Sequence, residues 1–239
     1  PFTFTRPVAD IRVGILTIRQ KWESYLEYTT TTVTEDYLSD KFPMVEMEEN
    51  IMINASFLPN MEVVEFVKNL SQNQALFKGE DVIAFFAKEG EEVKDFSTFE
   101  AVEFEGDILK IEHTWDIFAK NGEAIAEDFN LITKDRQSQP IPATVNTINP
   151  ENIFIEKGAI LNFVTLNASS GPIYIGRDAE VMEGSMVRGP FALCNNSTLK
   201  LASKIYGPTT VGPYSKVGGE IKNAVIFQNS NNGSCSFYR

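Results

Sequence analysis

An aliphatic residue returns at every sixth position along the distal part of this chain. The unbroken series is Ile175, Val181, Val187, Leu193, Leu199, Ile205, Val211 and Val217. Four positions after each of them stands a residue that is small in most cases: Ala179, Ser185, Phe191, Ser197, Ser203, Thr209, Ser215 and Ile221. Ile155 and Leu161 open the same series, which a two-residue slip interrupts between Asn167 and Pro172. A period of six fits neither a helix nor an alternating strand, but it fits a solenoid whose coil takes three hexads.

We therefore predict a parallel left-handed β-helix in residues 144–239. The aliphatic side chains would point inward, and each strand would pair with the next coil at about 4.8 Å. Ile221, four positions after Val217, is placed at a corner by this pattern. Because such a solenoid leaves flat faces and two open ends, we expect a homotrimer to cover part of it.

Residues 1–143 alternate between strand-like and helix-like patterns and predict a separate α/β domain. A short apolar run at 51–53, a turn at 59–60 and an amphipathic helix over 61–70 form one strand, turn and helix unit. In α/β units the ligand site lies at the carboxyl end of the strand. Simple core packing explains the same pattern equally well.

Other segments of the first domain have weaker patterns. Helical spacing is found over 19–28 and again over 112–132, and a buried strand is predicted over 82–86. The threonine-rich run 29–34 is β-prone and has no helical period. The polar segment 137–150 contains three prolines and is interpreted as the linker.

Composition limits the partners and the chemistry. A net charge of −12 argues against a nucleic-acid surface, although a few local cations can still hold a small phosphorylated ligand. No apolar stretch is long enough for a membrane span and no secretory leader is visible, so we expect no membrane partner and a cytoplasmic location. Cys194 and Cys235 are interpreted as reduced thiols. The chain begins at Pro1 without an initiator methionine, so we expect further residues before Pro1. The tail 229–239 loses the hexad pattern, so we expect further coils after Arg239.

Several segments together resemble a known family. They are Gly-Pro-Ile-Tyr-Ile-Gly (171–176), Ala-Glu-Val-Met-Glu-Gly (179–184), Val-Arg-Gly-Pro (187–190) and the hexads of 204–213, with the N-terminal segment 1–14. These resemble the bacterial proteins that join a sugar nucleotidyltransferase to a hexapeptide-repeat acyltransferase. The resemblance is to the bifunctional N-acetylglucosamine-1-phosphate uridylyltransferase and glucosamine-1-phosphate acetyltransferase family. Segment 1–14 is similar to the second half of that family's nucleotide-binding signature.

The resemblance implies a nucleotidyltransferase-like, Rossmann-like first domain. Such a domain joins a nucleoside triphosphate to a sugar 1-phosphate with Mg²⁺, and UDP-N-acetylglucosamine is the product that the family implies. Arg6 and Arg12 would lie near the triphosphate, where a guanidinium can bind phosphate oxygens bidentately. From the residues alone, Arg6 could equally cap a strand and Arg12 could be a solvated surface charge.

The chain departs from the family's metal site. Asn54, Ala55 and Ser56 stand where the family has a glycine-aspartate pair that binds Mg²⁺, so Asn54 and Ser56 become candidate nucleotide-binding residues. Asp10 or Asp128 could substitute as the metal-binding carboxylate. The family's lysine two residues after the arginine is replaced by Val8.

The β-helix would, by the same resemblance, transfer an acetyl group from acetyl-coenzyme A. That reaction needs a base, which is commonly a histidine on a coil. His113 is the only histidine and lies in the first domain, where a helix or surface role is favoured over catalysis. Two functions stay open: a sugar-1-phosphate nucleotidyltransferase, and a non-catalytic nucleotide-sugar-binding or scaffold protein that trimerises through the β-helix.

Overall fold

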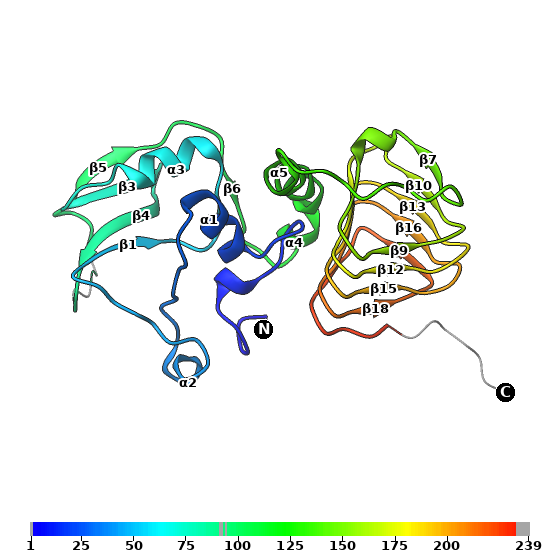
Figure 1. Ribbon diagram of the computed structural model, residues 1–239. Helices are drawn as coiled ribbons and strands as arrows, with labels where there is room; N and C mark the ends of the chain where they lie inside the picture. The colour runs from blue at the N-terminus through cyan, green and yellow to red at the C-terminus, as the bar shows by residue number, and fades with distance from the viewer. Residues whose placement is uncertain (1, 91–92, 94, 233–239) are drawn as a thin grey trace. The chain divides into compact units, whose positions relative to one another are not determined.

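The computed structural model describes residues 2–90, 93 and 95–232 (Figure 1). The chain forms two compact units. Unit 1 contains the residues up to Ile11 together with Thr17–Glu112, and unit 2 contains Arg12–Leu16 together with the residues from His113 onward. The chain thus enters unit 2 for five residues before it returns to unit 1. Among the helices of the described ranges, none has the length and hydrophobicity that crossing a bilayer requires.

Unit 1 is built on a four-stranded sheet. Its strand order is β1 (Glu49–Ile53), β4 (Asp81–Lys88), β3 (Gln74–Lys78) and β5 (Glu100–Glu103). β4 runs antiparallel to both β1 and β3, and only the pair β3 and β5 is parallel. A smaller antiparallel sheet joins β2 (Phe57–Leu58) to β6 (Leu109–Lys110). The predicted α/β character of the N-terminal region is confirmed.

The helices of unit 1 are η1 (Val8–Asp10), α1 (Ile18–Leu26), α2 (Asp36–Ser39) and α3 (Met61–Lys68). α1 is capped by Thr17, whose hydroxyl accepts from the Gln20 amide at 3.2 Å while the Gln20 side chain accepts from the Thr17 amide at 3.0 Å. This reciprocal capping satisfies two amides that an unpaired helix start leaves free. The predicted helices over 19–28 and 61–70 are therefore present. The β-prone run 29–34 belongs to no strand.

Unit 2 contains a parallel β-helix whose coils are stacked in Figure 1. The first sheet comprises β7 (Asn146–Ile148), β10 (Thr165–Asn167), β13 (Met186–Arg188), β16 (Lys204–Tyr206) and β19 (Glu220–Lys222). The second comprises β8 (Ile153–Ile155), β11 (Ile173–Ile175), β14 (Phe191–Leu193), β17 (Thr209–Val211) and β20 (Val225–Ile226). The third comprises β9 (Ile160–Leu161), β12 (Glu180–Val181), β15 (Thr198–Leu199) and β18 (Lys216–Val217). All strand pairs in these three sheets are parallel, which confirms the predicted solenoid.

The strand register explains the six-residue spacing. Ile173 pairs with Phe191, 18 positions later, so one coil takes three hexads. The spaced aliphatic residues are buried and form one continuous core. The slip is visible as well, because Ile173 pairs with Ile153, 20 positions earlier. The last coil is shorter: Ile221 pairs with Ile205, 16 positions earlier, and is buried. The predicted corner position of Ile221 is therefore wrong, because the short coil brings it to the inward aliphatic position.

The small corner residues connect neighbouring coils through their hydroxyl groups. The Ser197 hydroxyl donates to the Gly212 carbonyl at 2.8 Å and accepts from the Ser215 amide at 3.2 Å. The Ser185 hydroxyl likewise accepts from the Ser203 amide at 3.3 Å. Buried hydroxyls and amides need such partners, so a serine corner both fits the tight bend and satisfies the backbone there.

One sheet of the β-helix is covered on its outer face. The helical segments of unit 2 are α4 (Asp116–Ala119), α5 (Asn121–Thr133) and η2 (Pro150–Asn152). Ile173 and Ile175 point into the coil, whereas Tyr174 between them packs outside in a second cluster. The buried members of that cluster are Ile15, Ile125, Phe154, Tyr174, Ala192 and Cys194. Residues 113–143 therefore belong to the compact unit of the β-helix, whereas the predicted boundary stood at 143/144.

The segment Arg12–Leu16 is held in unit 2 by polar contacts. Asp128 Oδ2 accepts from the amides of Ile15 and Leu16 at 2.7 and 3.0 Å. Asn121 Oδ1 accepts from the Gly14 amide at 2.8 Å, and the Thr210 hydroxyl donates to the Gly14 carbonyl at 3.1 Å. The amides of Gly14, Ile15 and Leu16 and the Gly14 carbonyl therefore have partners from α5 or β17.

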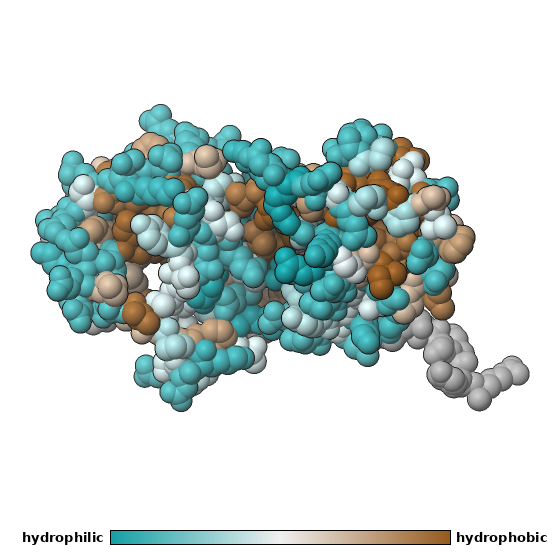
Figure 2. All heavy atoms as spheres, viewed as in Figure 1, coloured by the Kyte–Doolittle hydropathy of each residue, from teal (hydrophilic) through white to brown (hydrophobic). Residues whose placement is uncertain are grey.

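Figure 2 shows apolar surface exposed on the coils of the β-helix in this view. The large exposed apolar side chains of these coils and their corners include Ile148, Ile160, Phe163, Met186 and Leu201. Exposed apolar patches commonly mark interaction surfaces. The expected homotrimer stays a prediction.

The buried phenol of Tyr174 tests how the segment that follows α5 is attached to the β-helix. The Tyr174 hydroxyl donates to Glu156 Oε1 at 2.9 Å, and Arg136 Nη2 donates to Glu156 Oε2 at 2.7 Å. Burial, reinforced by the Glu156 charge, raises the pKa of Tyr174 above its ordinary value. The unfolded chain loses this proton above about pH 10 while the folded chain keeps it, so the stability contributed by Tyr174 is present below that pH and is lost above it.

We expect the free energy of unfolding to fall more steeply between about pH 10 and pH 11 in the wild type than in Tyr174→Phe, which cannot titrate at this position. Denaturant unfolding at several pH values measures both slopes. Equal slopes would show that the Tyr174 hydroxyl has the same pKa in the folded and unfolded chains.

Candidate functional site

Unit 1 contains a cavity of about 1200 Å³. Its lining comes from six parts of the chain: the N-terminal segment, α1, the segment 30–38, the end of β1 with the following turn, β4, and Phe96. A cavity of this size is ample for a nucleotide or a sugar phosphate. Both apolar and polar groups line it, which suits a ligand with a ring system and a charged end.

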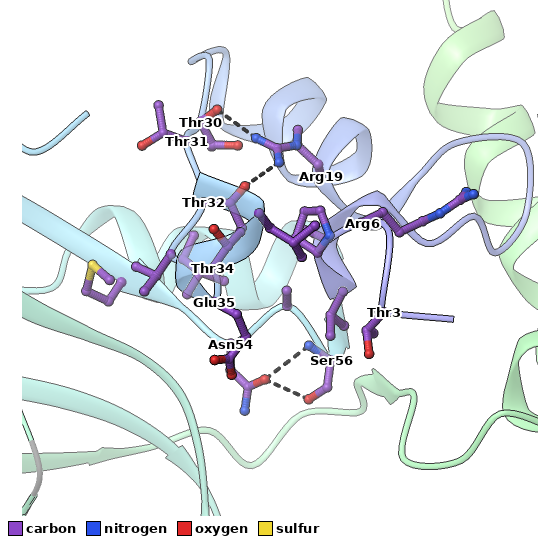
Figure 3. Close-up of a pocket in the computed structure, with 18 of the residues that line it drawn as sticks. Thr3, Arg6, Arg19, Thr30, Thr31, Thr32, Thr34, Glu35, Asn54 and Ser56 are labelled. Carbon is purple, nitrogen blue, oxygen red and sulfur yellow. Dashed lines mark hydrogen bonds between the residues drawn. The ribbon is translucent and has the colours of Figure 1, made fainter. Parts of the chain in front are cut away.

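Arg19 organises one wall of the cavity, as Figure 3 shows. Its Nη1 donates to the Thr30 carbonyl at 3.0 Å and its Nη2 donates to the Thr32 hydroxyl. Its Nε pairs with Asp10 Oδ1 at 2.7 Å. Glu23, also on α1, accepts from both the amide and the hydroxyl of Thr30, at 2.8 and 3.1 Å. The threonine segment is thus attached to α1 through charged side chains.

Asn54 and Ser56 line the cavity where β1 ends. Asn54 Oδ1 accepts from the Ser56 amide at 3.0 Å and from the Ser56 hydroxyl at 2.8 Å. Asn54 Nδ2 donates to the Val82 carbonyl on β4 at 3.0 Å. The side-chain amide of Asn54 therefore makes its hydrogen bonds within the turn and to β4. The Ser56 hydroxyl oxygen still has lone pairs that can accept a hydrogen bond from a ligand.

Arg6 also lines the cavity, next to Pro7, Val8 and Ala9. Figure 3 shows its guanidinium directed away from Arg19 and Asn54. Arg6, Asn54 and Ser56 are thus three of the four predicted binding residues, and they line one cavity. Their predicted contacts with a nucleotide stay predictions.

Arg12, the fourth predicted binding residue, is buried in unit 2 and does not line this cavity. Its guanidinium donates to the Ile15 carbonyl and lies 3.8 Å from the Cys194 sulfur. Burial raises the pKa of the Cys194 thiol, with the Arg12 charge acting in the opposite direction. This environment gives Arg12 a structural role in the turn, and a role in phosphate binding stays a prediction.

The two candidate metal ligands also differ in their surroundings. Asp128 is 2 % exposed and its carboxylate already accepts from two backbone amides, so it does not fit a metal site that a nucleotide must reach. Asp10 is bound to Arg19. Within residues 2–90, 93 and 95–232, no group of three or more His, Cys, Asp or Glu side chains is arranged to hold a metal ion.

The remaining sequence predictions concern His113 and the cysteines. His113 is exposed in unit 2, where its amide donates to Asp116 Oδ2 at 2.9 Å and its ring lies 4.3 Å from that of Trp115. Cys194 is a buried free thiol. Cys235 lies outside the described residues, as does most of the tail 229–239.

Sequence reasoning did not find Arg19 and the threonine wall. Their signal was the coincidence of an acidic residue at position 10, an arginine at 19 and the hydroxyl-rich run that begins at 29. Nothing in the local spacing shows that these three positions meet, because the contacts depend on how α1 packs beside η1.

A family model described as sugar nucleotidyl transferase matches residues 1–137. This range covers more than half of the chain and includes every residue that lines the cavity. No curated protein matches the chain.

Proposed function

Because this chain belongs to the sugar nucleotidyl transferase family, we propose that the cavity of unit 1 joins a nucleoside triphosphate to a sugar 1-phosphate. A phosphate oxygen of the sugar 1-phosphate attacks the α-phosphorus of the triphosphate. The bond from that phosphorus to the bridging oxygen breaks, and pyrophosphate leaves with the electron pair. The product is a nucleotide sugar, and we propose UDP-N-acetylglucosamine as its identity.

The observation that carries this proposal is that the family match and the cavity coincide. Arg6 contributes a guanidinium that binds phosphate oxygens and offsets the charge that develops on the leaving group. Ser56 accepts a hydrogen bond from a sugar hydroxyl or from the base. The β-helix supplies an acyltransferase-like second unit, for which acetyl-coenzyme A is the proposed cofactor.

A second function is favoured by a specific observation. Asn54, Ala55 and Ser56 replace the glycine-aspartate pair to which the resemblance assigns the Mg²⁺ site, and Asn54 is used to shape its own turn. Such a cavity could bind a nucleotide sugar without turning it over. The β-helix would then serve as a scaffold for assembly.

Pyrophosphate release separates the two functions. The purified chain is incubated with each nucleoside triphosphate and a panel of sugar 1-phosphates, with and without Mg²⁺, while binding of nucleotide sugars is measured by calorimetry. Release of pyrophosphate that depends on both substrates supports the transferase. Micromolar binding of a nucleotide sugar without release supports the binding protein, and the absence of both contradicts each proposal.

Arg6 is the cavity-lining cation proposed to bind the triphosphate, and its guanidinium would have to turn toward the ligand from the direction that Figure 3 shows. We expect Arg6→Met to weaken triphosphate binding or kcat/KM by about 100-fold, since a charge-assisted bond to phosphate is lost. Arg6→Lys keeps the positive charge but loses the planar guanidinium, so its affinity should lie between those of the wild type and Arg6→Met. Arg188, which lies on β13 of the other unit, gives the matched control Arg188→Met. Equal affinities of Arg6→Met and Arg188→Met would contradict the assignment.

A further inference from the structure

We propose that Asp10 and Arg19 are positioning residues that hold Thr30–Leu38, here called the threonine strap, as a wall of the substrate cavity. The assignment gives Asp10 a role different from metal binding. The part of this proposal that concerns substrate binding rests on the proposed function. The part that concerns the ordering of the strap can be measured without any substrate.

The strap has little apolar anchoring of its own. Between α1 and β1, residues 27–48 contain a single buried side chain, that of Leu38. Segments with so few buried apolar contacts open at low free-energy cost unless specific polar bonds hold them. The position of this wall therefore depends on its polar contacts.

Arg19 supplies the central contacts. Its fork reaches the Thr30 carbonyl and the Thr32 hydroxyl while its Nε is held by Asp10, so one side chain connects three partners. A guanidinium is planar and presents its donors in fixed directions, so fixing Nε fixes the direction of the other two. The side chains of Arg19 and Asp10 are 18 % and 24 % exposed, so solvent screens this pair less than a surface pair.

Asp10 ends η1, which directly follows Arg6 and Pro7 in the chain. The ion pair therefore joins the cavity wall formed by residues 6–9 to the wall formed by the strap. The strap in turn offers Val33 and Tyr37 to the cavity, and these side chains are 61 % and 62 % exposed. Exposed apolar side chains in a cavity are suited to contact a base or a sugar ring.

Hydrogen exchange of peptides covering residues 28–42, measured without ligand, tests whether Asp10 and Arg19 order the strap. We expect Asp10→Asn, Arg19→Gln and Thr32→Val each to speed exchange of these amides by about 10-fold. Thr32→Ser keeps the hydroxyl and should stay near the wild type. The matched control is Asp81→Asn, which removes a carboxylate 2.6 Å from Lys110 in the same unit without altering the strap contacts. Unchanged exchange in Asp10→Asn and Arg19→Gln would overturn the proposal.

Measurements with substrate test whether the ordered strap contributes to substrate binding. A positioning role predicts that Asp10→Asn raises KM, or the dissociation constant of the nucleotide, by about 10-fold, with kcat and the half-saturating Mg²⁺ concentration unchanged. A large rise in the Mg²⁺ requirement with unchanged exchange would instead make Asp10 a metal ligand. If the wild type neither binds nor turns over any substrate, the proposed function fails, and the exchange data still decide whether the ion pair orders the strap.

Discussion

Leu199→Asn is expected to unfold the β-helix, whereas Thr198→Asn on the same strand is expected to leave it folded. Leu199 is fully buried and stacks between Val181 and Val217 in the neighbouring coils. An amide at this position would lose the apolar contacts and find no bonding partner in the aliphatic core. The combined loss is about 4 to 7 kcal/mol, which is comparable with the whole stability of many domains.

Thr198 gives the matched control because it is the preceding residue and its side chain is partly exposed. An outward amide should change the free energy of unfolding by about 0.5 kcal/mol or less. Urea unfolding followed by far-ultraviolet circular dichroism measures both variants. Similar midpoints for the two variants would mean that Leu199 does not face the interior of the coil.

Gly14→Ala is expected to destabilise unit 2 by about 3 to 5 kcal/mol. Gly14 has a φ of +82°, and a Cβ there would lie 2.5 Å from Asp128 Oδ2 and 2.7 Å from the Ala124 carbonyl oxygen. The added methyl group would push apart the contacts that hold Arg12–Leu16. Loss of those contacts would leave the Ile15 and Leu16 amides without the carboxylate that accepts from them.

Gly79→Ala is the control that measures the effect of backbone strain without steric crowding. Its φ is +61°, and nothing lies within 4 Å of a Cβ built there. Gly79→Ala therefore places an alanine in the left-handed conformation without a steric clash, and its free energy of unfolding should fall by about 1 kcal/mol. Thermal unfolding of both variants gives the comparison. A Gly14→Ala protein as stable as Gly79→Ala would show that the turn moves away from α5 without loss.

The β-helix was the predictable part of the fold, because its contacts repeat. In the regular coils each residue pairs with the one 18 positions later, so the same residue type is required at the same place in successive coils, as Val181, Leu199 and Val217 show. The packing of residues 113–143 was not predicted. Its signal lies in the outward residues of one sheet, since Phe154, Tyr174 and Ala192 are apolar where solvent-facing positions would be polar. Local periodicity does not show which helix covers them.

The candidate site was predictable only in part. Arg6, Asn54 and Ser56 belong to short segments with a recognisable resemblance, and they line the cavity. Asp128 and Asp10 were proposed from their residue type alone. Charge does not reveal that one carboxylate binds backbone amides in a buried turn while the other binds an arginine nine positions later. Such partners depend on tertiary packing.

The position of Arg12–Leu16 in unit 2 affects how the chain can be truncated. A fragment that stops at Glu112 would carry this segment without Asp128, Asn121 and Thr210, which bind the amides of Gly14, Ile15 and Leu16 and the Gly14 carbonyl. Its buried residues, including Val13 and Ile15, would then meet water. A cut after Glu112 therefore separates Arg12–Leu16 from the residues that bind it, whereas the whole chain keeps them together.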